Sequence, residues 1–218
     1  MKNLVKNSKV SKKIIERLTK YLRCLQTLSP TDFISSEEMG ILLGVTAAQI
    51  RKDLSNFIPE FDCNIGIRGK GYQINVLAAA LEKILGLHKE NNVIIVGAGR
   101  LGGAILMDGD FIKNGFNVVG IFDIAKNKIG KEYKGLKVKS INELENLLEK
   151  TAVEIAILTE CQPIAQDMIE IVVNAGIKSI LNFTPTEVRV PKDVTIAHID
   201  LNGKLQELNY WKEQVKTI

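Results

Sequence analysis

Hydrophobic residues recur at helical spacing in the first 88 residues of the chain. Four of them fall on one face of a helix predicted over residues 12–27: Ile14, Leu18, Leu22 and Leu25. Ser29-Pro30 ends this helix, and a run rich in Ala and Leu predicts another over residues 77–87. We therefore expect this part of the chain to be mainly helical.

Two short helices joined by a tight turn are predicted between residues 35 and 55. Ser35 and Glu38 form a capping box, Gly44 closes the first helix, and Thr46 caps the second. The second helix carries three polar side chains: Gln49, Arg51 and Lys52. In a helix-turn-helix, the second helix offers such side chains to guanine, adenine and phosphate in the major groove. Short helical pairs also occur in proteins that never bind nucleic acid.

The segment after the second helix is typical of a β-wing. Residues 66–74 combine turn glycines with two cations, Arg68 and Lys70, and a strand-like Tyr-x-Ile-x-Val alternation begins at Tyr72. The tight turn, the basic second helix and the basic wing together favour a nucleic-acid-binding module.

Charge is distributed unevenly along the chain. Residues 1–88 hold 13 Lys and Arg against 8 Asp and Glu, whereas residues 89–218 hold 16 against 17. The basic excess therefore lies in the first part, where it would attract a polyanion. The lysines of the first 20 residues fit a solvated tail equally well.

From residue 93 the pattern changes to strand, helix, strand. The apolar run 93–96 is typical of a parallel strand buried on both faces. A glycine-rich turn follows it: Gly97, Ala98, Gly99, Arg100, Leu101 and Gly102. A helix continues to Met107, and a second apolar strand over residues 118–122 ends at Asp123. This G-x-G-x-x-G arrangement places a pyrophosphate at a helix N-terminus, as in Rossmann-type dinucleotide-binding domains.

Asp123 is placed to accept hydrogen bonds from an adenosine ribose, which favours NAD(H) over NADP(H). Two more strands are predicted over residues 153–158 and 177–181, with a helix over 163–174 that Gly176 closes. The residues after these strands should face the nicotinamide half of the cofactor: Thr159, Glu160, Cys161, Asn182, Phe183, Thr184 and Pro185.

The last stretch of the chain, residues 201–216, predicts a helix with an apolar stripe of Leu205, Leu208 and Trp211. Such a stripe requires a partner. The polar residues 88–92 mark a domain boundary, so we expect domains over residues 1–88 and 89–200, followed by the C-terminal helix over 201–218.

Composition narrows the remaining classes. The chain has 218 residues, of which 45% are hydrophobic and 25% charged, so it can bury cores. It has no apolar stretch of about 18 residues and no signal-peptide h-region, so we expect no membrane span and a cytoplasmic location. Three dispersed cysteines, Cys24, Cys63 and Cys161, and two histidines predict neither a disulfide framework nor a metal site.

Catalytic candidates are few. Tyr133 and Lys137 have the Tyr-x-x-x-Lys spacing of short-chain dehydrogenases, but Gly135 lies between them and the segment is interpreted as a solvated loop. His198 is interpreted as a partly buried strand residue. An NAD-dependent oxidoreductase with a basic regulatory or oligomerisation module, and a Rossmann-like domain that binds coenzyme A, remain alternatives.

Seven features of the chain resemble the Rex family of redox-sensing transcriptional repressors. They are residues 34–38, 44–55, 69–72 and 97–102, Asp123 with residues 128–130, and residues 175–183 and 199–201. The resemblance implies a homodimer that places two winged-helix domains on a pseudo-palindromic operator while Rossmann domains sense NADH against NAD⁺. It also implies a C-terminal helix exchanged between subunits, release from DNA on NADH binding, no turnover, no metal and no membrane.

The resemblance implies roles for individual residues. The predicted DNA-binding set is Ser35, Thr46, Ala47, Gln49, Arg51, Lys52, Ser55, Arg68, Lys70 and Tyr72. Lys128 joins the glycine turn and Asp123 around the cofactor, and Asp200 is expected near the nicotinamide and the dimer interface. Two departures from the family pattern are Asp108, where the family often has Tyr, and the longer segment 58–65 before the wing.

Overall fold

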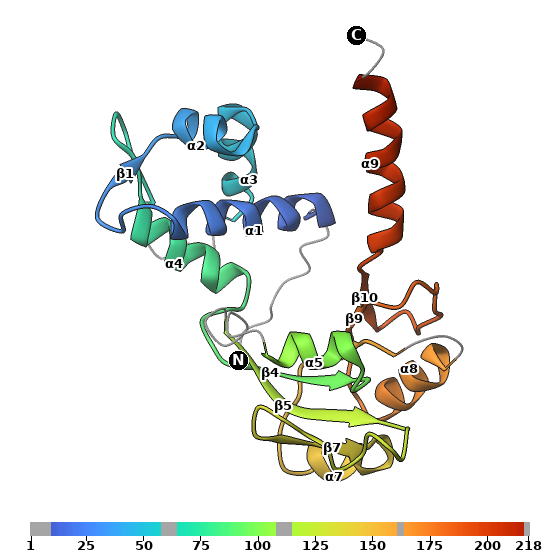
Figure 1. The fold of residues 1–218 in the computed structure, drawn as a ribbon. Coiled ribbons are helices and arrows are strands. Elements are labelled where there is room, and N and C mark those ends of the chain that lie inside the picture. The colour runs from blue at the N-terminus through green and yellow to red at the C-terminus, as the bar shows by residue number, and fades with distance from the viewer. Residues whose placement is uncertain (1–9, 58–64, 108–114, 161–163, 216–218) are drawn as a thin grey trace. The chain divides into compact units, whose positions relative to one another are not determined.

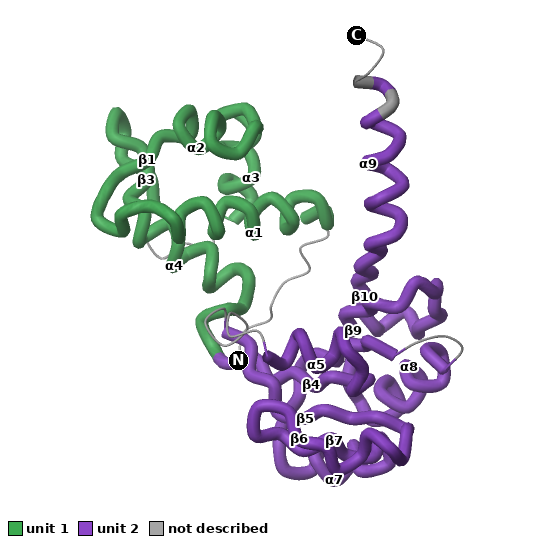
Figure 2. Tube along the Cα trace, in the orientation of Figure 1, with its two compact units in different colours: residues 1–89 green, residues 90–218 purple. Residues whose placement is uncertain are grey.

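The structure, a computed structural model, describes residues 10–57, 65–107, 115–160 and 164–215. Cys63, Asp108, Cys161 and most of the segment before the wing, on which the sequence analysis made predictions, lie outside these ranges. The chain divides into two compact units, residues 1–89 and 90–218, which are described separately (Figure 2).

The first unit is a winged helix-turn-helix (Figure 1). Its elements are α1 (Lys12–Gln26), β1 (Phe33–Ile34), α2 (Ser36–Leu43), α3 (Ala47–Ser55), β2 (Gly66–Ile67), β3 (Gly71–Gln73) and α4 (Ile74–Ile84). The three short strands form an antiparallel sheet in the order β1-β3-β2. Leu18, Ile50 and Leu77 are wholly buried in the core that joins α1, α3 and α4.

The predicted helix signals of this unit are confirmed. Ser35 and Glu38 form both hydrogen bonds of a capping box at the start of α2. Gly44 ends α2 in the left-handed conformation, with φ of 66°, and the Thr46 side chain accepts a hydrogen bond from the backbone of Gln49. Local polar residues and one glycine thus set the turn between α2 and α3.

The predicted strand through Val76 is wrong. Strand β3 ends at Gln73, and α4 begins at Ile74, three residues before the helix that the sequence predicted. Ile74, Leu77 and Leu81 are all buried, and their spacing suits a helix that packs on α1. Burial of this apolar face outweighs the local strand-like alternation.

The second unit is a Rossmann-type domain built on a seven-stranded sheet. Its strands are β4 (Asn91–Val96), β5 (Phe116–Asp123), β6 (Glu132–Tyr133), β7 (Leu136–Ser140), β8 (Ile155–Leu158), β9 (Ser179–Asn182) and β10 (Thr195–His198). The order is β10-β9-β8-β4-β5-β7-β6, in which every neighbouring pair except β6 and β7 is parallel. Without the edge strand β6, this is the strand order of a dinucleotide-binding fold.

Helices cover both faces of this sheet (Figure 1). They are α5 (Arg100–Met107), the short pair η2 (Ile141–Glu143) and α7 (Leu144–Leu148), and α8 (Ala165–Asn174). Ile95 packs with α5 on one face, whereas Ile94 packs with α7 and α8 on the other. The alternating burial of β4 explains why its sequence is continuously apolar.

The segment around Tyr133 is not a solvated loop. Strands β6 and β7 form a hairpin whose turn residues, Lys134 and Gly135, both have positive φ, 48° and 82°. Such a two-residue turn matches the twist of the strands that it connects. The Tyr133 ring lies half-buried against Gly103 of α5.

The chain ends in α9 (Leu201–Val215), which is confirmed as a helix. Leu205, Leu208 and Trp211 are 64%, 64% and 57% exposed. More than half of each side chain therefore remains exposed in the single chain, although the three form the apolar stripe that the sequence predicted.

Candidate functional site

The glycine turn lies at the carboxyl end of β4, between β4 and α5. The turn follows the point where the sheet order reverses, with β5 on one side of β4 and β8 on the other. Ligands of open α/β sheets bind in the crevice at this switch point. The fold thus brings Gly97–Gly102 and the residues after β8 to the same edge.

Three glycines of the turn differ in what surrounds them. A Cβ on Gly97 would lie 2.8 Å from the backbone nitrogen of Glu160, and φ there is +113°. A Cβ on Gly102 would lie 2.0 Å from the Gly97 carbonyl oxygen. A Cβ on Gly99 would have none of the described residues within 4 Å. The chain itself therefore requires glycine at 97 and 102, whereas at 99 it leaves open space.

Thr159, the first residue after β8, is hydrogen-bonded to the start of the glycine turn. Its hydroxyl donates to the Gly97 carbonyl oxygen at 2.7 Å, and its backbone N–H donates to the carbonyl of Val96. Thr159 is half-buried and Glu160 is buried. The predicted residues Thr159 and Glu160 therefore lie against the glycine turn.

Asp123 ends β5 beside the same turn and is 1% exposed. Its Oδ2 accepts the Ala98 N–H at 2.8 Å and the Lys128 ammonium at 2.7 Å, and its Oδ1 accepts the Ala125 N–H at 2.8 Å. Burial alone would raise the pKa of Asp123, but the hydrogen bonds from Lys128 and the two backbone amides outweigh it and hold that pKa below its usual range. The carboxylate is ionised and fastens β5 to the glycine turn.

The predicted residues after β9 serve mainly their own loop. Asn182 is wholly buried; its Oδ1 accepts the backbone N–H and hydroxyl of Thr184, and its Nδ2 faces the Thr186 carbonyl and His198 Nδ1. Phe183 is half-buried and Pro185 is exposed. His198, predicted to be partly buried, is exposed in this chain, because β10 is the edge strand.

Asp200 precedes α9 and is exposed. Its Oδ1 accepts the Gly203 N–H at 2.9 Å, so the carboxylate caps the first turn of α9. A Cβ at position 203 would lie 2.3 Å from Asp200 Oδ2, so a side chain there would displace the capping carboxylate.

In the first unit, α3 exposes one stripe of side chains. Ala48, Lys52 and Ser55 follow each other at helical spacing and are exposed, with Arg51 beside them. Ala47, which was predicted to contact DNA, is half-buried and lies off this stripe. Ala48, which the sequence analysis did not single out, lies on this stripe, four residues before Lys52.

Gln49 lies on the flank of α3, where its amide nitrogen donates to Asp53 Oδ1 at 2.8 Å. Asp53 is 1% exposed and also accepts two hydrogen bonds from Arg17 and one from Tyr21. Burial alone would raise the pKa of Asp53, but these hydrogen bonds outweigh it and lower that pKa. Burial and the Asp53 hydrogen bond raise the pKa of Tyr21, and the Asp53 hydrogen bond raises that of Arg17.

Arg51 contacts the first turn of α2. Its Nη1 donates to Ser36 Oγ at 2.6 Å and to Glu37 Oε1 at 2.9 Å. The Arg51 hydrogen bond, together with bonds from the Glu37 backbone and Ser36, lowers the pKa of Glu37. Ser35 itself is engaged in the capping box.

The wing presents its cations to solvent. Arg68 and Lys70 are exposed, and the Lys70 ammonium lies 5.9 Å from the centre of the Phe33 ring. Tyr72 is half-buried, and burial raises its pKa. The wing and the exposed stripe of α3 thus offer cations and hydroxyls from separate elements of one unit.

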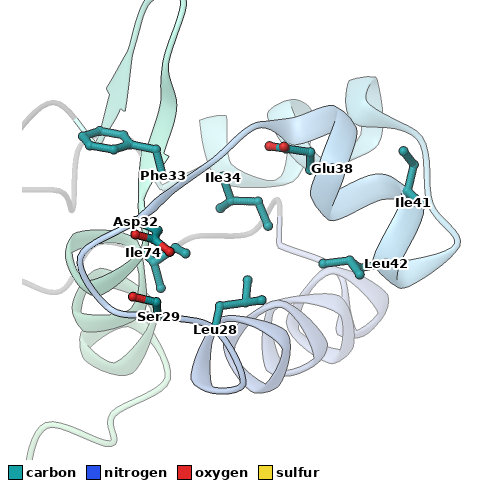
Figure 3. A pocket seen from close by; sticks show the side chains of 9 residues that line it. All are labelled: Leu28, Ser29, Asp32, Phe33, Ile34, Glu38, Ile41, Leu42 and Ile74. Carbon is teal, nitrogen blue, oxygen red and sulfur yellow. The ribbon is translucent and has the colours of Figure 1, made fainter.

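A groove of about 370 Å³ opens elsewhere on the first unit (Figure 3). It is lined by Leu28, Ser29, Asp32, Phe33, Ile34, Glu38, Ile41, Leu42 and Ile74. None of the residues predicted to bind DNA or cofactor lines it. Within the described ranges, no group of three or more His, Cys, Asp or Glu could hold a metal, and no helix is long and apolar enough to cross a membrane.

Comparison with known proteins covers both units. Residues 88–186 match a family model described as "CoA binding domain", and residues 9–55 match one described as "Putative DNA-binding protein N-terminus". The redox-sensing transcriptional repressor Rex of Caldicellulosiruptor saccharolyticus is 38% identical over 209 residues, which cover 95% of this chain and 93% of that protein.

Two solved structures of RSP, a Rex-family repressor, are also similar. RSP in complex with beta-NAD+ and operator DNA has a TM-score of 0.87 and 38% identity, over 95% of this chain and 94% of that one. RSP in complex with beta-NADH has a TM-score of 0.84 and 37% identity, over 96% and 97%.

Proposed function

The chain belongs to the Rex family of redox-sensing transcriptional repressors, and from this premise we propose that it binds operator DNA as a homodimer and leaves it when NADH binds. In this proposal residues 1–88 form the DNA-binding domain, 89–200 the cofactor-binding domain and 201–218 a helix exchanged between subunits. NAD⁺ and NADH are the two cofactor states, and the protein acts in the cytoplasm without turnover.

The open space at Gly99 carries the proposal. Gly97 and Gly102 are explained by contacts within the chain, but none of the described residues lies within 4 Å of a Cβ at position 99. A glycine at this position lets a pyrophosphate approach the backbone at the start of α5, where N–H groups and the helix dipole favour anions. The site therefore fits a dinucleotide.

Asp123 suits the adenosine ribose of that dinucleotide. Oδ1 accepts one hydrogen bond within the described chain, so it has an acceptor position left for a ribose hydroxyl. The Lys128 ammonium bonds Oδ2 and its side chain is 30% exposed, so it would border the bound sugar. The nicotinamide half would then be lined or bordered by Thr159, Glu160, Cys161, Asn182, Phe183, Thr184, Pro185 and Asp200.

Coenzyme A is the second candidate, because the model that matches residues 88–186 carries that name. Coenzyme A has a phosphate on its adenosine ribose, whereas the Asp123 carboxylate accepts hydrogen bonds and repels phosphate. The acceptor at the end of β5 therefore favours NAD(H), in agreement with the ligands of the RSP structures.

The two units perform different parts of the mechanism. Phosphates and bases would be contacted by Lys52, Ser55, Thr46 and the wing cations. The apolar stripe of α9 in each subunit would be buried against the other subunit. A two-fold dimer contacts half-sites about one helical turn, ~34 Å, or a multiple apart. NADH binding would change the spacing of the two DNA-binding domains and so lower the operator affinity.

The contacts of Tyr133 support a protein without turnover. In the β6–β7 hairpin Tyr133 pairs with Leu136 and Glu132 pairs with Lys137, so Tyr133 and Lys137 project from opposite faces. They do not form the catalytic pair that their spacing suggested. Consumption of NADH with a small carbonyl compound would instead support the oxidoreductase alternative.

Operator binding at fixed salt tests the proposal. We would enrich a duplex from a random pool with the protein in NAD⁺, then titrate it in NADH, NAD⁺ and NADPH. We expect NADH to weaken binding and NADPH to have little effect, and in a separate salt series we expect affinity to fall steeply. Equal affinity in NADH and NAD⁺ would remove the sensor function, since a ligand with equal affinity for both states shifts nothing.

Gly99→Val sharpens this experiment. The added Cβ meets none of the described residues within 4 Å, so we expect the fold to be retained while the dinucleotide is excluded. We expect the variant to bind operator regardless of NADH. Ala104→Val, at an exposed position of α5, is the matched control and should keep the NADH response.

A further inference from the structure

We infer that Ser36 and Glu37 are positioning residues that fix Arg51 so that the Nε–Nη2 edge of its guanidinium, and not its terminal edge, contacts a guanine. The inference rests on the proposed operator binding. Ser36 and Glu37 lie outside the set of DNA-binding residues that the sequence predicted.

The three side chains form a closed ring of hydrogen bonds. Arg51 Nη1 donates to Ser36 Oγ at 2.6 Å and to Glu37 Oε1 at 2.9 Å, and Ser36 Oγ donates to Glu37 Oε2 at 3.2 Å. The hydroxyl hydrogen of Ser36 goes to Glu37, so its lone pairs are left for Arg51. The orientation of the hydroxyl follows from the ring.

The ring uses both hydrogens of one guanidinium nitrogen. Arginine has five N–H donors in a planar fork, of which Nη1 supplies two. Both face Ser36 and Glu37, while Nε and Nη2 have no partner within the described residues. A guanine offers O6 and N7 to two parallel N–H groups. The terminal edge needs Nη1 and is occupied, so the Nε–Nη2 edge is the one available.

The ring is anchored on rigid structure at one side. Ser36 is 6% exposed and begins α2. Helix α2 packs on α3, and the tight turn at Gly44 connects the two. Arg51 and Glu37, in contrast, are 53% and 64% exposed, so their ion pair alone would be weak and mobile in solvent. The buried serine therefore supplies the fixed point that an exposed pair lacks.

A competing role for Glu37 predicts a different effect of removing its carboxylate. If its carboxylate merely occupied Arg51 and repelled phosphate, removing it would strengthen binding to every duplex. If it positions Arg51, removing it would weaken discrimination at one guanine, because a side chain that is no longer fixed loses more freedom on binding. The two roles therefore differ in a ratio of affinities and not merely in affinity.

The experiment measures that ratio on the enriched operator in NAD⁺. Each guanine of a half-site is replaced by adenine or by 7-deazaguanine, which lacks N7, and wild type is compared with Ser36→Ala, Glu37→Ala, Arg51→Ala and Glu37→Ala/Arg51→Ala. Glu16→Gln, which removes an exposed acid from α1, is the charge control. Hydrogen exchange of α2 and α3 confirms that each variant is folded.

We expect wild type to prefer one guanine by about tenfold or more. Glu37→Ala and Ser36→Ala should reduce this preference severalfold, and the double variant should match Arg51→Ala. Full guanine preference in Glu37→Ala and Ser36→Ala would overturn the inference while leaving operator binding intact. Failure of wild type to enrich any duplex would instead reject the proposed function, and the inference with it.

Discussion

Among the residues that the structure describes, each unit has one aspartate that is 1% exposed, and the two carboxylates are satisfied in different ways. Asp53 accepts four hydrogen bonds, all from side chains: two from Arg17, one from Tyr21 and one from Gln49. Asp123 accepts three, from two backbone amides and from Lys128. A carboxylate has about four acceptor positions, so the first is saturated and the second is not.

The difference indicates what each carboxylate is for. Asp53 joins α3 to α1 and has no capacity left for a ligand, so it is a strut of the DNA-binding unit. Asp123 holds the glycine turn and keeps one acceptor position beside the space at Gly99. A buried acid whose donors come from two helices stabilises packing, whereas one whose donors come from a loop can also serve a ligand.

Asp53→Ala is expected to have the largest effect. It leaves the buried Tyr21 hydroxyl and the Arg17 guanidinium without their acceptor, which costs about 3–5 kcal/mol for a broken buried pair. Hydrogen exchange should show loss of protection in α1 and α3 but not in β4 or β5. Asp193→Ala, which removes an exposed acid paired with Lys178, should change little. Equal loss of protection in both variants would contradict the role of Asp53.

Asp123→Ala should cost less, about 1–3 kcal/mol, because Lys128 can turn to solvent and the main loss is the acceptor of the Ala98 and Ala125 amides. Protection should fall around β4 and β5, and calorimetry should show weaker NADH binding. Undiminished NADH binding would mean that the remaining acceptor position does not serve the ribose.

Acidification should affect both units less than either deletion, because protonation leaves the side chains in place. Both aspartates have a pKa below the ordinary value of about 3.9. Their contribution to stability is therefore complete above about pH 5 and is lost as the pH falls through the lowered pKa. We would measure stability by hydrogen exchange between pH 5 and 2.5. As the pH falls, stability should decline less steeply than in wild type for the first unit of Asp53→Asn and for the second unit of Asp123→Asn. An unchanged profile would show that neither group governs acid unfolding.

Much of both units could be predicted because the signals are local. The capping box at Ser35, the turn at Gly44 and the glycine turn at Gly97 depend on neighbours within a few residues. The Asp53 network could not, since Arg17 and Tyr21 lie 36 and 32 residues away. The hairpin at Tyr133 was missed because its packing on Gly103 is a tertiary contact that overrides a basic, turn-like sequence.

Gln49→Ala should have the smallest effect and bears most directly on the comparison, because it removes one of the four donors from Asp53. Ionised Asp53 only accepts hydrogen bonds, so the Gln49 nitrogen must face it, and one N–H that the sequence assigned to adenine is used within the chain. The expected loss is about 0.5–1.5 kcal/mol, seen as lower protection of α3.

The second hydrogen of that nitrogen and the amide oxygen remain for a base, so the bond to Asp53 and a base contact can coexist in Gln49. We therefore expect Gln49→Ala to weaken operator binding as well as α3. Weaker operator binding with full protection of α3 would mean that Gln49 recognises a base and contributes nothing to the stability of α3. Lower protection with unchanged operator affinity would make it a strut like Asp53, and would leave the exposed stripe of α3 and Arg51 to read the bases.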